Sequence, residues 1–379
     1  MKKIISFLMI AAMAIIVSVS FTACSSDSDD TSKNVEDYQT IVDNQVKAQK
    51  NASKKNKALL LVAFGSTWPE PFTDFDNTIN AYKSAFPDHD VYFSFSSAIC
   101  RNRAAAGEHA EDQGAPKRNY YAPDIWLESL GRVEYAEITV QSLQVIPGEE
   151  YATVVACLKG FANNSKNDLR DEYLKNVKLH MGTPLMATGS DDPAEDNDVT
   201  KLAKELHTIY GTKAQEGAML FMGHGNPDDL DIFSANVRYE QLEKALRTNN
   251  PGCQYFVGTV DMMGNFKTFV KQRMQDAGFA SGKVFCAPLM SIAGDHANND
   301  MAGNDADWTF NEETGEYEDT SWKVYFSDSR GGGYTCDNST MIVKGLLAYP
   351  KILQLWINHT SDALNSDPLE WYHSNVSGE

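Results

Sequence analysis

Residues 57–64 read Lys-Ala-Leu-Leu-Leu-Val-Ala-Phe, a short and almost uninterrupted apolar run that ends in Gly65-Ser66-Thr67. A continuous apolar run of this length, bounded by turn residues, is typical of a buried strand in a parallel sheet. A helical pattern over about 71–86 follows it, and residues 90–96 alternate as a second strand. The run therefore predicts a fold built from alternating strands and helices.

The alternation continues along the chain and starts again after a polar, acidic stretch at residues 189–198. The later strands are expected at 136–140, 177–181, 218–222, 254–260 and 284–290, and the later helices at 123–131, 148–161, 199–210, 235–248 and 266–277. This order predicts an α/β fold of two similar lobes, at residues 57–194 and 195–365, each with a doubly wound parallel sheet. Ligands of such sheets bind beyond the carboxyl ends of the strands, so we expect the site in the cleft between the lobes.

The last part of the chain departs from this pattern. Residues 305–335 form an aromatic and acidic insertion in the second lobe, which we expect to contain a β-hairpin lying over the cleft. Residues 341–359 indicate a closing helical region that Pro350 interrupts, and residues 366–379 a frayed tail.

The first residues have the features of an export signal. Lys2 and Lys3 precede an apolar run from Ile4 to Val19, and no acidic residue occurs before Asp27. A basic start followed by an apolar run that is short for a membrane span is typical of a secretory signal peptide. An uncleaved anchor helix is the alternative interpretation.

The apolar run ends at Phe21-Thr22-Ala23-Cys24, which resembles the lipobox of bacterial lipoproteins. We therefore expect residues 1–23 to be removed and Cys24 to carry a lipid. Residues 24–56 are expected to form a tether and a docking helix. The protein would then be attached to a bacterial membrane on its extracytoplasmic side, in the periplasm or at the cell surface.

Acidic residues outnumber basic ones by 52 to 33, which gives a formal net charge of −19, or −21 after removal of Lys2 and Lys3 with the signal. A protein that binds the phosphate backbone needs the opposite sign, so we expect no nucleic-acid partner. The excess of acid favours solubility and cations, and an anionic ligand would need a local group of donors.

The cysteines do not follow a disulfide or zinc pattern. If Cys24 is lipidated, an odd number remains, and no CxxC pair occurs. This argues against a disulfide scaffold and against a cysteine-rich zinc site, although one disulfide remains possible. The remaining cysteines are Cys100, Cys157, Cys253, Cys286 and Cys336.

Metal-competent side chains follow three predicted strands of the second lobe. His224 lies in Met222-Gly223-His224-Gly225, Asp261 follows Val257-Gly258-Thr259-Val260, and His296 lies in the run Ala-Gly-Asp-His-Ala-Asn-Asn-Asp-Met-Ala-Gly at 293–303. Two imidazoles and one carboxylate suit Co²⁺, Ni²⁺, Fe²⁺ or Zn²⁺ and leave coordination positions open. Asp295 or Asp300 is the expected acceptor for an imidazole N–H.

These motifs resemble those of the anaerobic, class II sirohydrochlorin cobaltochelatases. The resemblance covers roughly residues 57–360, and the run at 293–303 is its most specific part. Further stretches agree in order: Phe64-Gly65-Ser66-Thr67, Val140-Gln141-Ser142-Leu143, Ile146-Pro147-Gly148-Glu149-Glu150-Tyr151, Val257-Gly258-Thr259-Val260 and Ser321-Trp322-Lys323, the last displaced by the insertion. The resemblance implies a two-lobed chelatase fold related to ferrochelatase, and insertion of Co²⁺ into a tetrapyrrole with release of two protons.

The resemblance also implies roles for individual residues. The two metal-site histidines of the family match His224 and His296, which we assign as metal ligands and proton acceptors. The acidic partner, usually glutamate, is Asp261 here. Gln144 stands where the family is expected to have histidine, and glutamine cannot accept a proton near neutral pH.

The carboxylates of a tetrapyrrole need hydrogen-bond donors. The candidates are Ser66 and Thr67 after the first strand, Arg101 and Arg103 after the second, and Gln144. Ordinary surface charge is the alternative interpretation for the two arginines. The remaining histidines have no motif around them and are expected to be surface or structural residues: His89, His109, His180, His207, His359 and His373.

Three functions fit these observations. The first is an extracytoplasmic, lipid-anchored cobaltochelatase, for which Co²⁺ is a substrate and no organic cofactor is expected. The second is a lipoprotein that binds metal or a tetrapyrrole such as haem or a corrinoid precursor, having lost or reversed the chelatase reaction. The third is a secreted α/β domain without metal chemistry.

Overall fold

The computed structural model describes residues 35–304, 310–311, 316–317, 320–327 and 332–369. The expected signal peptide, Cys24 and the start of the tether lie outside these residues, as do much of the insertion and the end of the tail. Within the described part of the chain, no helix has both the length and the apolar character that crossing a membrane requires.

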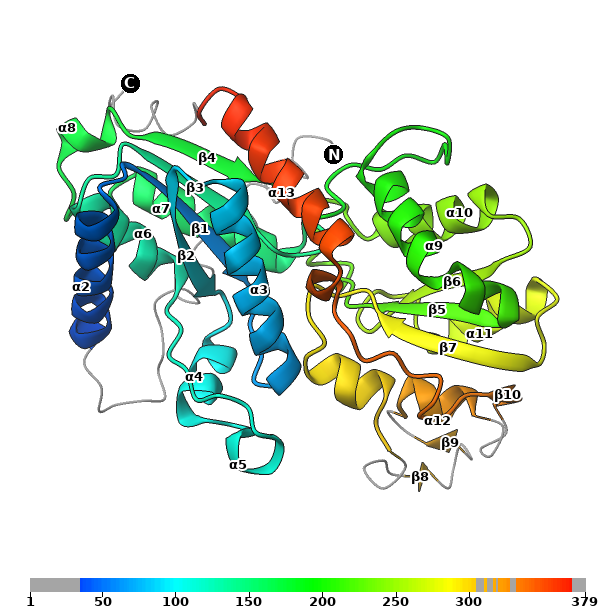
Figure 1. Ribbon diagram of the computed structural model, residues 1–379. Coiled ribbons are helices and arrows are strands. Elements are labelled where there is room, and N and C mark those ends of the chain that lie inside the picture. Colours follow the sequence, from blue (N-terminus) through cyan, green and yellow to red (C-terminus); the bar gives the residue numbers. More distant parts are fainter. Residues whose placement is uncertain (1–34, 305–309, 312–315, 318–319, 328–331, 370–379) are drawn as a thin grey trace, which may run out of the picture.

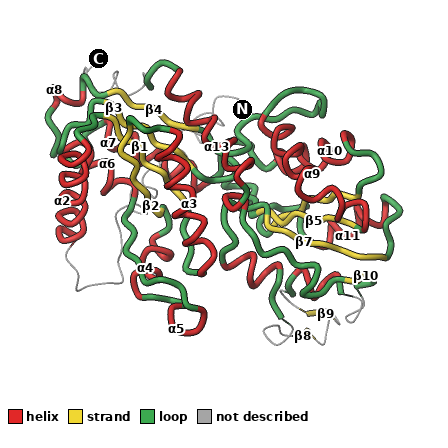
Figure 2. Tube along the Cα trace, in the orientation of Figure 1, coloured by secondary structure: helices red, strands yellow, loops and turns green. Residues whose placement is uncertain are grey.

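The first lobe contains a parallel sheet of four strands. They are β1 (Lys57–Ala63), β2 (His89–Phe95), β3 (Glu137–Ser142) and β4 (Lys178–Gly182), in the order β2-β1-β3-β4. Helices cover both faces of the sheet (Figure 2). The helices of this part are α2 (Val35–Ser53), α3 (Pro69–Ala85), α4 (Ala98–Ala106), α5 (Ala110–Gln113), α6 (Pro123–Arg132), α7 (Glu149–Ala162) and α8 (Asp171–Leu174).

The second lobe repeats this topology. Its sheet contains β5 (Ala218–Gly223), β6 (Gln254–Thr259), β7 (Gly282–Pro288) and β10 (Tyr334–Thr335), in the order β10-β7-β5-β6. In both sheets the first strand lies between the second and the third, and all described pairings between these strands are parallel. Its helices are α9 (Asp198–Glu216), α10 (Val237–Asn249), α11 (Lys267–Asp276) and α12 (Trp322–Phe326). The predicted fold class, α/β with two similar parallel-sheet lobes, is confirmed.

Strand β1 shows why its sequence is apolar throughout. Leu59 and Leu61 face a core that extends into the second lobe, whereas Leu60 and Val62 face a separate core. All four side chains are fully buried because successive side chains of a strand point to opposite faces, and both faces are covered. Helix α2 covers one face through Val42 and contributes to the second core, as a docking helix would.

Helix α13 (Pro350–Asn365) corrects the domain boundary expected from the sequence. The second lobe expected from the sequence includes residues 350–365, but α13 packs along β3 and β4 of the first sheet. Thr360 donates a hydrogen bond to the side chain of Gln141 at 2.7 Å. Pro350 starts the helix rather than interrupting it. Proline is tolerated at the first helical position because a backbone N–H there would form no hydrogen bond within the helix.

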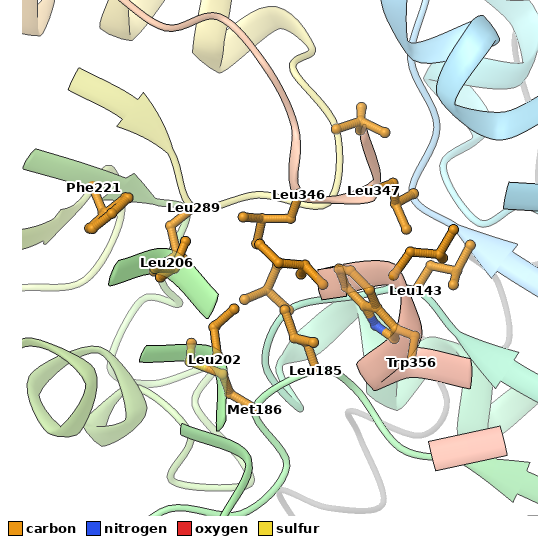
Figure 3. Close-up of a cluster of buried hydrophobic side chains, with 14 of the residues drawn as sticks. Leu143, Leu185, Met186, Leu202, Leu206, Phe221, Leu289, Leu346, Leu347 and Trp356 are labelled. Atoms are coloured by element: carbon orange, nitrogen blue, oxygen red, sulfur yellow. The ribbon is translucent and has the colours of Figure 1, made fainter. Parts of the chain in front are cut away.

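The two lobes share one apolar core. Leu143 and Leu185 from the first lobe pack with Leu202 and Leu289 from the second, and Trp356 of α13 closes the group (Figure 3). A short 3₁₀ helix, Leu346–Ala348, leads the chain through this contact into α13. The cleft between the lobes is therefore closed at its base by packed side chains.

The insertion contains two short strands, β8 (Phe310–Asn311) and β9 (Glu316–Tyr317), which pair antiparallel as a hairpin requires. In the view of Figure 1 they are drawn below α12, at the edge of the second lobe. The end of the expected hairpin segment is instead helix α12, which begins after Ser321 because the hydroxyl of Ser321 accepts a hydrogen bond from Val324 N.

Candidate active site

A cavity of about 280 Å³ lies between the lobes, at the carboxyl ends of four strands. Residues 64–68 follow β1 and residues 144–146 follow β3, and both segments line the cavity. Residues 224–226 follow β5 and residues 289–292 follow β7, and they line it from the second lobe. The expected position of the site, beyond the strand ends and between the lobes, is where this cavity lies.

His224 stands directly after β5 in a tight loop. Its Nδ1 lies 2.8 Å from the carbonyl oxygen of Gly225 and 3.4 Å from a carboxylate oxygen of Asp261. Gly225 has a φ of +78°, and a Cβ there would come within 2.8 Å of the Cβ of Met262. Glycine at this position therefore lets the His224 loop approach the Asp261 loop closely.

Asp261 is held next to His224 by the backbone. Its N–H donates to the carbonyl of His224 at 2.9 Å, and the N–H of Val260 also bonds this carbonyl, at 3.0 Å. Asp261 itself is not one of the residues that line the cavity. Its carboxylate lies on the side of His224 that faces away from the cavity, 3.4 Å from Nδ1 of the imidazole.

His296 begins a π-helical turn, Ala297–Met301, on the same side of the cavity. Its Nδ1 lies 2.5 Å from a carboxylate oxygen of Asp300. The hydrogen bond to Asp300 raises the pKa of His296 and outweighs the opposing effect of burial, and the charges of Asp261 and Asp295 act in the same direction as Asp300. Of the two acceptors expected from the sequence, Asp300 is the one that contacts the ring.

The two imidazoles are neighbours. Their ring centres are 4.8 Å apart at an interplanar angle of 83°. In both rings Nδ1 faces a fixed oxygen acceptor, and in the described structure neither Nε2 has a hydrogen-bond partner. This arrangement selects the tautomer whose Nε2 carries a lone pair.

The described residues contain no group of three or more His, Cys, Asp or Glu side chains arranged to hold a metal ion. The structure thus brings His224, His296 and Asp261 together but does not form a closed three-ligand site from them. Two open imidazoles with a carboxylate behind one of them are suited to transient binding of a cation.

The Ser321-Trp322-Lys323 motif supports the segment that follows His296. The buried ammonium of Lys323 donates to the carbonyl of Ala302 at 2.7 Å and to the side chains of Asn304 and Asn338 at 2.9 and 2.8 Å. The hydroxyl of Ser321 donates to the carbonyl of Gly303 at 3.0 Å. The motif therefore fixes residues 302–304, at the end of the π-helical turn, and does not line the cavity.

Three uncharged residues expected to bind the tetrapyrrole line the first-lobe wall of the cavity: Ser66, Thr67 and Gln144. All three are buried. The hydroxyl of Ser66 accepts a hydrogen bond from the backbone N–H of Trp68 at 3.2 Å, which shapes the turn after β1. Gln144 accepts a hydrogen bond from the hydroxyl of Ser142 through its side-chain oxygen.

The two arginines differ, and the expectation for Arg101 is corrected. The guanidinium of Arg101 is buried and donates to the backbone carbonyls of Phe95 and Ser96, at 2.9 and 2.8 Å. It therefore stabilises the end of β2 and does not line the cavity. Arg103 does line the cavity, and it forms an ion pair with Glu108 at 3.6 Å.

Several lining residues were not predicted from the sequence. His109, expected to be a surface or structural residue, lines the cavity and packs on Trp68 with ring centres 4.6 Å apart. No local motif marks it, because helix α4 and the following turn bring it to Trp68. Glu150, which the sequence marks only as part of the stretch at 146–151, also lines the cavity.

The Gly148-Glu149 stretch contacts the second lobe. The N–H of Glu149 donates to the side chain of Asn226 at 3.4 Å, and a Cβ on Gly148 would come within 2.4 Å of the same side-chain oxygen. Burial raises the pKa of Glu149, with Glu150 adding to the rise and His224 opposing it. This contact joins the first turn of α7 to the His224 loop across the cleft.

The profile of the cobalt chelatase (CbiK) family matches residues 57–365. The chain belongs to the cobalt chelatase family. The resemblance to this family that the sequence motifs indicate is thereby confirmed. The lipoprotein form remains a prediction. Within the cobalt chelatase family, the motif at 293–303 now has a structural explanation, since it supplies His296 together with its acceptor Asp300.

Two named relatives are similar over most of their length. The sirohydrochlorin cobaltochelatase CbiKC of Nitratidesulfovibrio vulgaris is 28% identical over 323 residues, covering 85% of this chain and 95% of the relative. The sirohydrochlorin cobaltochelatase of Salmonella typhimurium is 26% identical over 312 residues, covering 82% and 97%. The solved structure of the sirohydrochlorin chelatase SirB from Bacillus subtilis subspecies spizizenii in complex with cobalt has a TM-score of 0.45 at 11% identity, covering 82% of this chain and 96% of that chain, a distant similarity.

Proposed function

We propose that this protein is a cobaltochelatase that inserts Co²⁺ into a tetrapyrrole of the sirohydrochlorin class. The observation that carries the proposal is the pair of imidazoles, His224 and His296, at the wall of a cavity between the lobes. Membership of the cobalt chelatase family and the names of the two relatives support the same reaction.

The reaction couples metal transfer to proton transfer. A free-base macrocycle that takes up Co²⁺ releases two protons. The Nε2 lone pairs of His224 and His296 bind the incoming Co²⁺, and the charge of Asp261 behind His224 favours the dication. When the pyrrole nitrogens take the metal, the two Nε2 atoms are vacated and each accepts one of the released protons.

Asp300 prepares His296 for both tasks. Its carboxylate on Nδ1 increases the electron density at Nε2, which strengthens metal binding and raises the affinity for a proton. The raised pKa of His296 agrees with this role. The apolar part of the lining, from Phe64, Ile99 and Trp68, gives the flat macrocycle a surface to pack on.

Proton acceptance in this protein does not involve residue 144. Gln144 lines the cavity at the position where the family is expected to have histidine, and an amide has no basic lone pair near neutral pH. This favours a second candidate function, in which the protein holds a tetrapyrrole without catalysing insertion, or removes its metal.

One experiment separates the two candidates. Purified protein, sirohydrochlorin and Co²⁺ are mixed under anaerobic conditions, and the absorbance change is compared with a reaction that lacks protein. For a chelatase we expect a faster insertion that His224→Ala or His296→Ala abolishes. The matched control is His207→Ala, because His207 contacts the hydroxyl of Tyr255 and is not among the lining residues.

No acceleration together with stoichiometric tetrapyrrole binding would support the binding protein and reject the enzyme. The same assay with Ni²⁺, Fe²⁺ and Zn²⁺ in place of Co²⁺ identifies the preferred metal, which the N/O ligand set does not restrict to cobalt.

We further propose that the protein is a lipoprotein of the extracytoplasmic side of a bacterial membrane. The support is sequence alone: the basic start, the apolar run and Phe21-Thr22-Ala23-Cys24. Mass spectrometry of the protein isolated from its membrane fraction would show a lipid on Cys24. An intact Met1 would reject cleavage and favour the uncleaved anchor helix.

A further inference from the structure

Gln144 carries a buried hydrogen-bond donor that has no partner. The residue is 8% exposed, lines the cavity, and leaves its Nε2 without a hydrogen-bond partner in the described structure. A buried N–H without an acceptor costs folding free energy, and such groups are rare in native proteins. A ligand that brings an acceptor into the cavity would remove this cost.

The amide is held in one orientation. The hydroxyl of Ser142, itself fully buried, donates to the side-chain oxygen of Gln144, so the oxygen is occupied and the NH₂ group is the free end. The backbone carbonyl of Gln144 accepts hydrogen bonds from the indole N–H of Trp356 at 3.2 Å and from Leu185 N at 3.1 Å. The donor is therefore preorganised by contacts with β3, α13 and the loop after β4.

Other neutral donors line the same cavity. The hydroxyls of Thr67 and Ser291 belong to buried residues, and within the described ranges neither has a hydrogen-bond partner. The lining contains a single arginine or lysine, Arg103, which already pairs with Glu108, and it contains two carboxylates, Glu150 and Asp295. Away from the histidines, an anionic group that enters the cavity is therefore bound mainly by neutral donors.

A tetrapyrrole offers two kinds of acceptor to an N–H donor. One kind is the inner ring nitrogens, but in the proposed reaction these nitrogens must face Nε2 of His224 and His296, where the metal is delivered. The other kind is the oxygens of the side-chain carboxylates at the edge of the macrocycle. Gln144 lies on the first-lobe wall, after β3, whereas both histidines lie on the second-lobe wall. Because Gln144 and the two histidines lie on opposite walls, the acceptor within reach of Gln144 is a carboxylate oxygen at the edge of the macrocycle.

We propose that the amide NH₂ of Gln144 binds one side-chain carboxylate of the tetrapyrrole, with the hydroxyls of Thr67 and Ser291 as additional donors. This deepens the proposed function, on which it rests, by naming the group of the substrate that the first-lobe wall of the cavity binds. One carboxylate is bound by neutral donors inside the cavity, and the remaining carboxylates stay at its mouth in water. Gln144 is then a specificity-determining residue.

The test measures binding without metal, so that it does not depend on insertion. Sirohydrochlorin and its methyl ester are titrated, in the same detergent-containing buffer, into the wild-type protein and into Gln144→Glu, and binding is followed by quenching of tryptophan fluorescence. A glutamate repels a carboxylate but not an ester. We expect the variant to bind the acid at least tenfold more weakly and the ester less than threefold more weakly.

The matched control is Gln354→Glu, which makes the same substitution on the exposed face of α13, outside the cavity. It should leave both affinities within a factor of two. If Gln144→Glu does not fold, Gln144→Leu replaces it as a neutral variant of similar size, which should bind the acid about tenfold more weakly.

Equal affinities of wild type and variant, or equal losses for acid and ester, would overturn the proposal. A wild-type protein that binds neither compound would overturn it as well. The two proposals can be rejected independently. If the wild type binds sirohydrochlorin with the predicted dependence on Gln144 but does not accelerate cobalt insertion, the role of Gln144 is supported and the proposed cobaltochelatase function is rejected.

Discussion

Asp300 lies 2.5 Å from Nδ1 of His296, four residues along the chain at the same π-helical turn. The pair is built from one local segment, so its geometry does not depend on how the lobes are placed. The His224 contact differs, because Nδ1 of His224 faces its own loop at Gly225 and the separate loop of Asp261. One imidazole is thus oriented by its own helix and the other by the contact between two loops.

Replacing Asp300 by asparagine should slow cobalt insertion. The amide keeps the shape of the carboxylate but removes the charge that makes Nε2 of His296 a good ligand and base. Loss of such a partner lowers metal affinity or activity by about ten- to a hundredfold. Initial rates and Co²⁺ titrations would measure both effects. Asp276→Asn on α11 is the control, and equal rates for both variants would contradict the role of Asp300.

Gly225→Ala should destabilise the protein more than Gly278→Ala. Both glycines have a positive φ, +78° and +82°, so both variants carry a backbone cost of about 1 kcal/mol. Only at Gly225 would the new Cβ meet other atoms, within 2.8 Å of Met262, and overpacking adds roughly 1–3 kcal/mol. Urea unfolding measures the difference.

The activity of the two glycine variants gives a second comparison. We expect Gly225→Ala to lose cobalt insertion, because it separates the His224 loop from the Asp261 loop, and Gly278→Ala to retain it. Similar stabilities and similar rates in the two variants would show that the close approach at Gly225 is not required.

Lys323→Met should lower both stability and turnover. The substitution leaves the oxygen atoms of Ala302, Asn304 and Asn338 without their buried donor, at a cost of roughly 3 kcal/mol. Since Lys323 does not line the cavity, we expect kcat to fall and KM for the tetrapyrrole to change little. Lys283→Met is the matched control, because the exposed Lys283–Glu216 pair contributes at most about 1 kcal/mol.

His359→Gln should change how stability depends on pH. Nε2 of His359 on α13 lies 3.2 Å from a carboxylate oxygen of Asp198 at the start of α9, and both side chains are mostly buried. Burial lowers the pKa of His359, but the hydrogen bond and charge of Asp198 outweigh it, so the pKa lies above 6.5. Burial raises the pKa of Asp198, but its bonds to His359 and Thr188 outweigh it, so the pKa lies below 3.8.

A histidine with a raised pKa stabilises the folded state below its unfolded pKa of about 6.5, and this contribution is lost as the pH rises through the folded value. The Asp198 contribution is present above its unfolded pKa and is lost in strong acid. His359→Gln should therefore be less stable than the wild type near pH 5.5 and nearly equal to it near pH 9, with urea unfolding as the measurement. A difference that stays constant over this range would contradict the ion pair, and His207→Gln serves as control.

The strands of both lobes were predictable because their signal is local. The apolar run at 57–64 and the run at 218–222 each contain the buried residues of a central strand, and the residues that follow them lie at the site. His224 could be chosen because it stands directly after β5, and His296 because it lies in the motif at 293–303 that follows β7. Their mutual contact could not be deduced from spacing, since it depends on how the loops after β5 and β7 pack.

The errors all concern packing that no local sequence pattern specifies. Arg101 and Arg103 are two positions apart on one short helix, and only packing decides that the first faces carbonyl oxygens and the second the cavity. His109 reaches the site through Trp68, which is 41 positions earlier in the sequence. The sequence does not predict that α13 covers the first sheet, because no local pattern specifies which sheet the apolar face of a helix will pack on.

The apolar core shared by the two lobes (Figure 3) limits how far the protein can adapt its shape to a bound tetrapyrrole. Spreading the lobes would pull Leu143 and Leu185 away from Leu202 and Leu289 and expose them to water, at about 25 cal/mol for each Å² of apolar surface. Close-packed interiors resist such movement. The distance between the two walls of the cavity is therefore fixed before a ligand binds, and a tetrapyrrole that enters must fit the cavity as it stands.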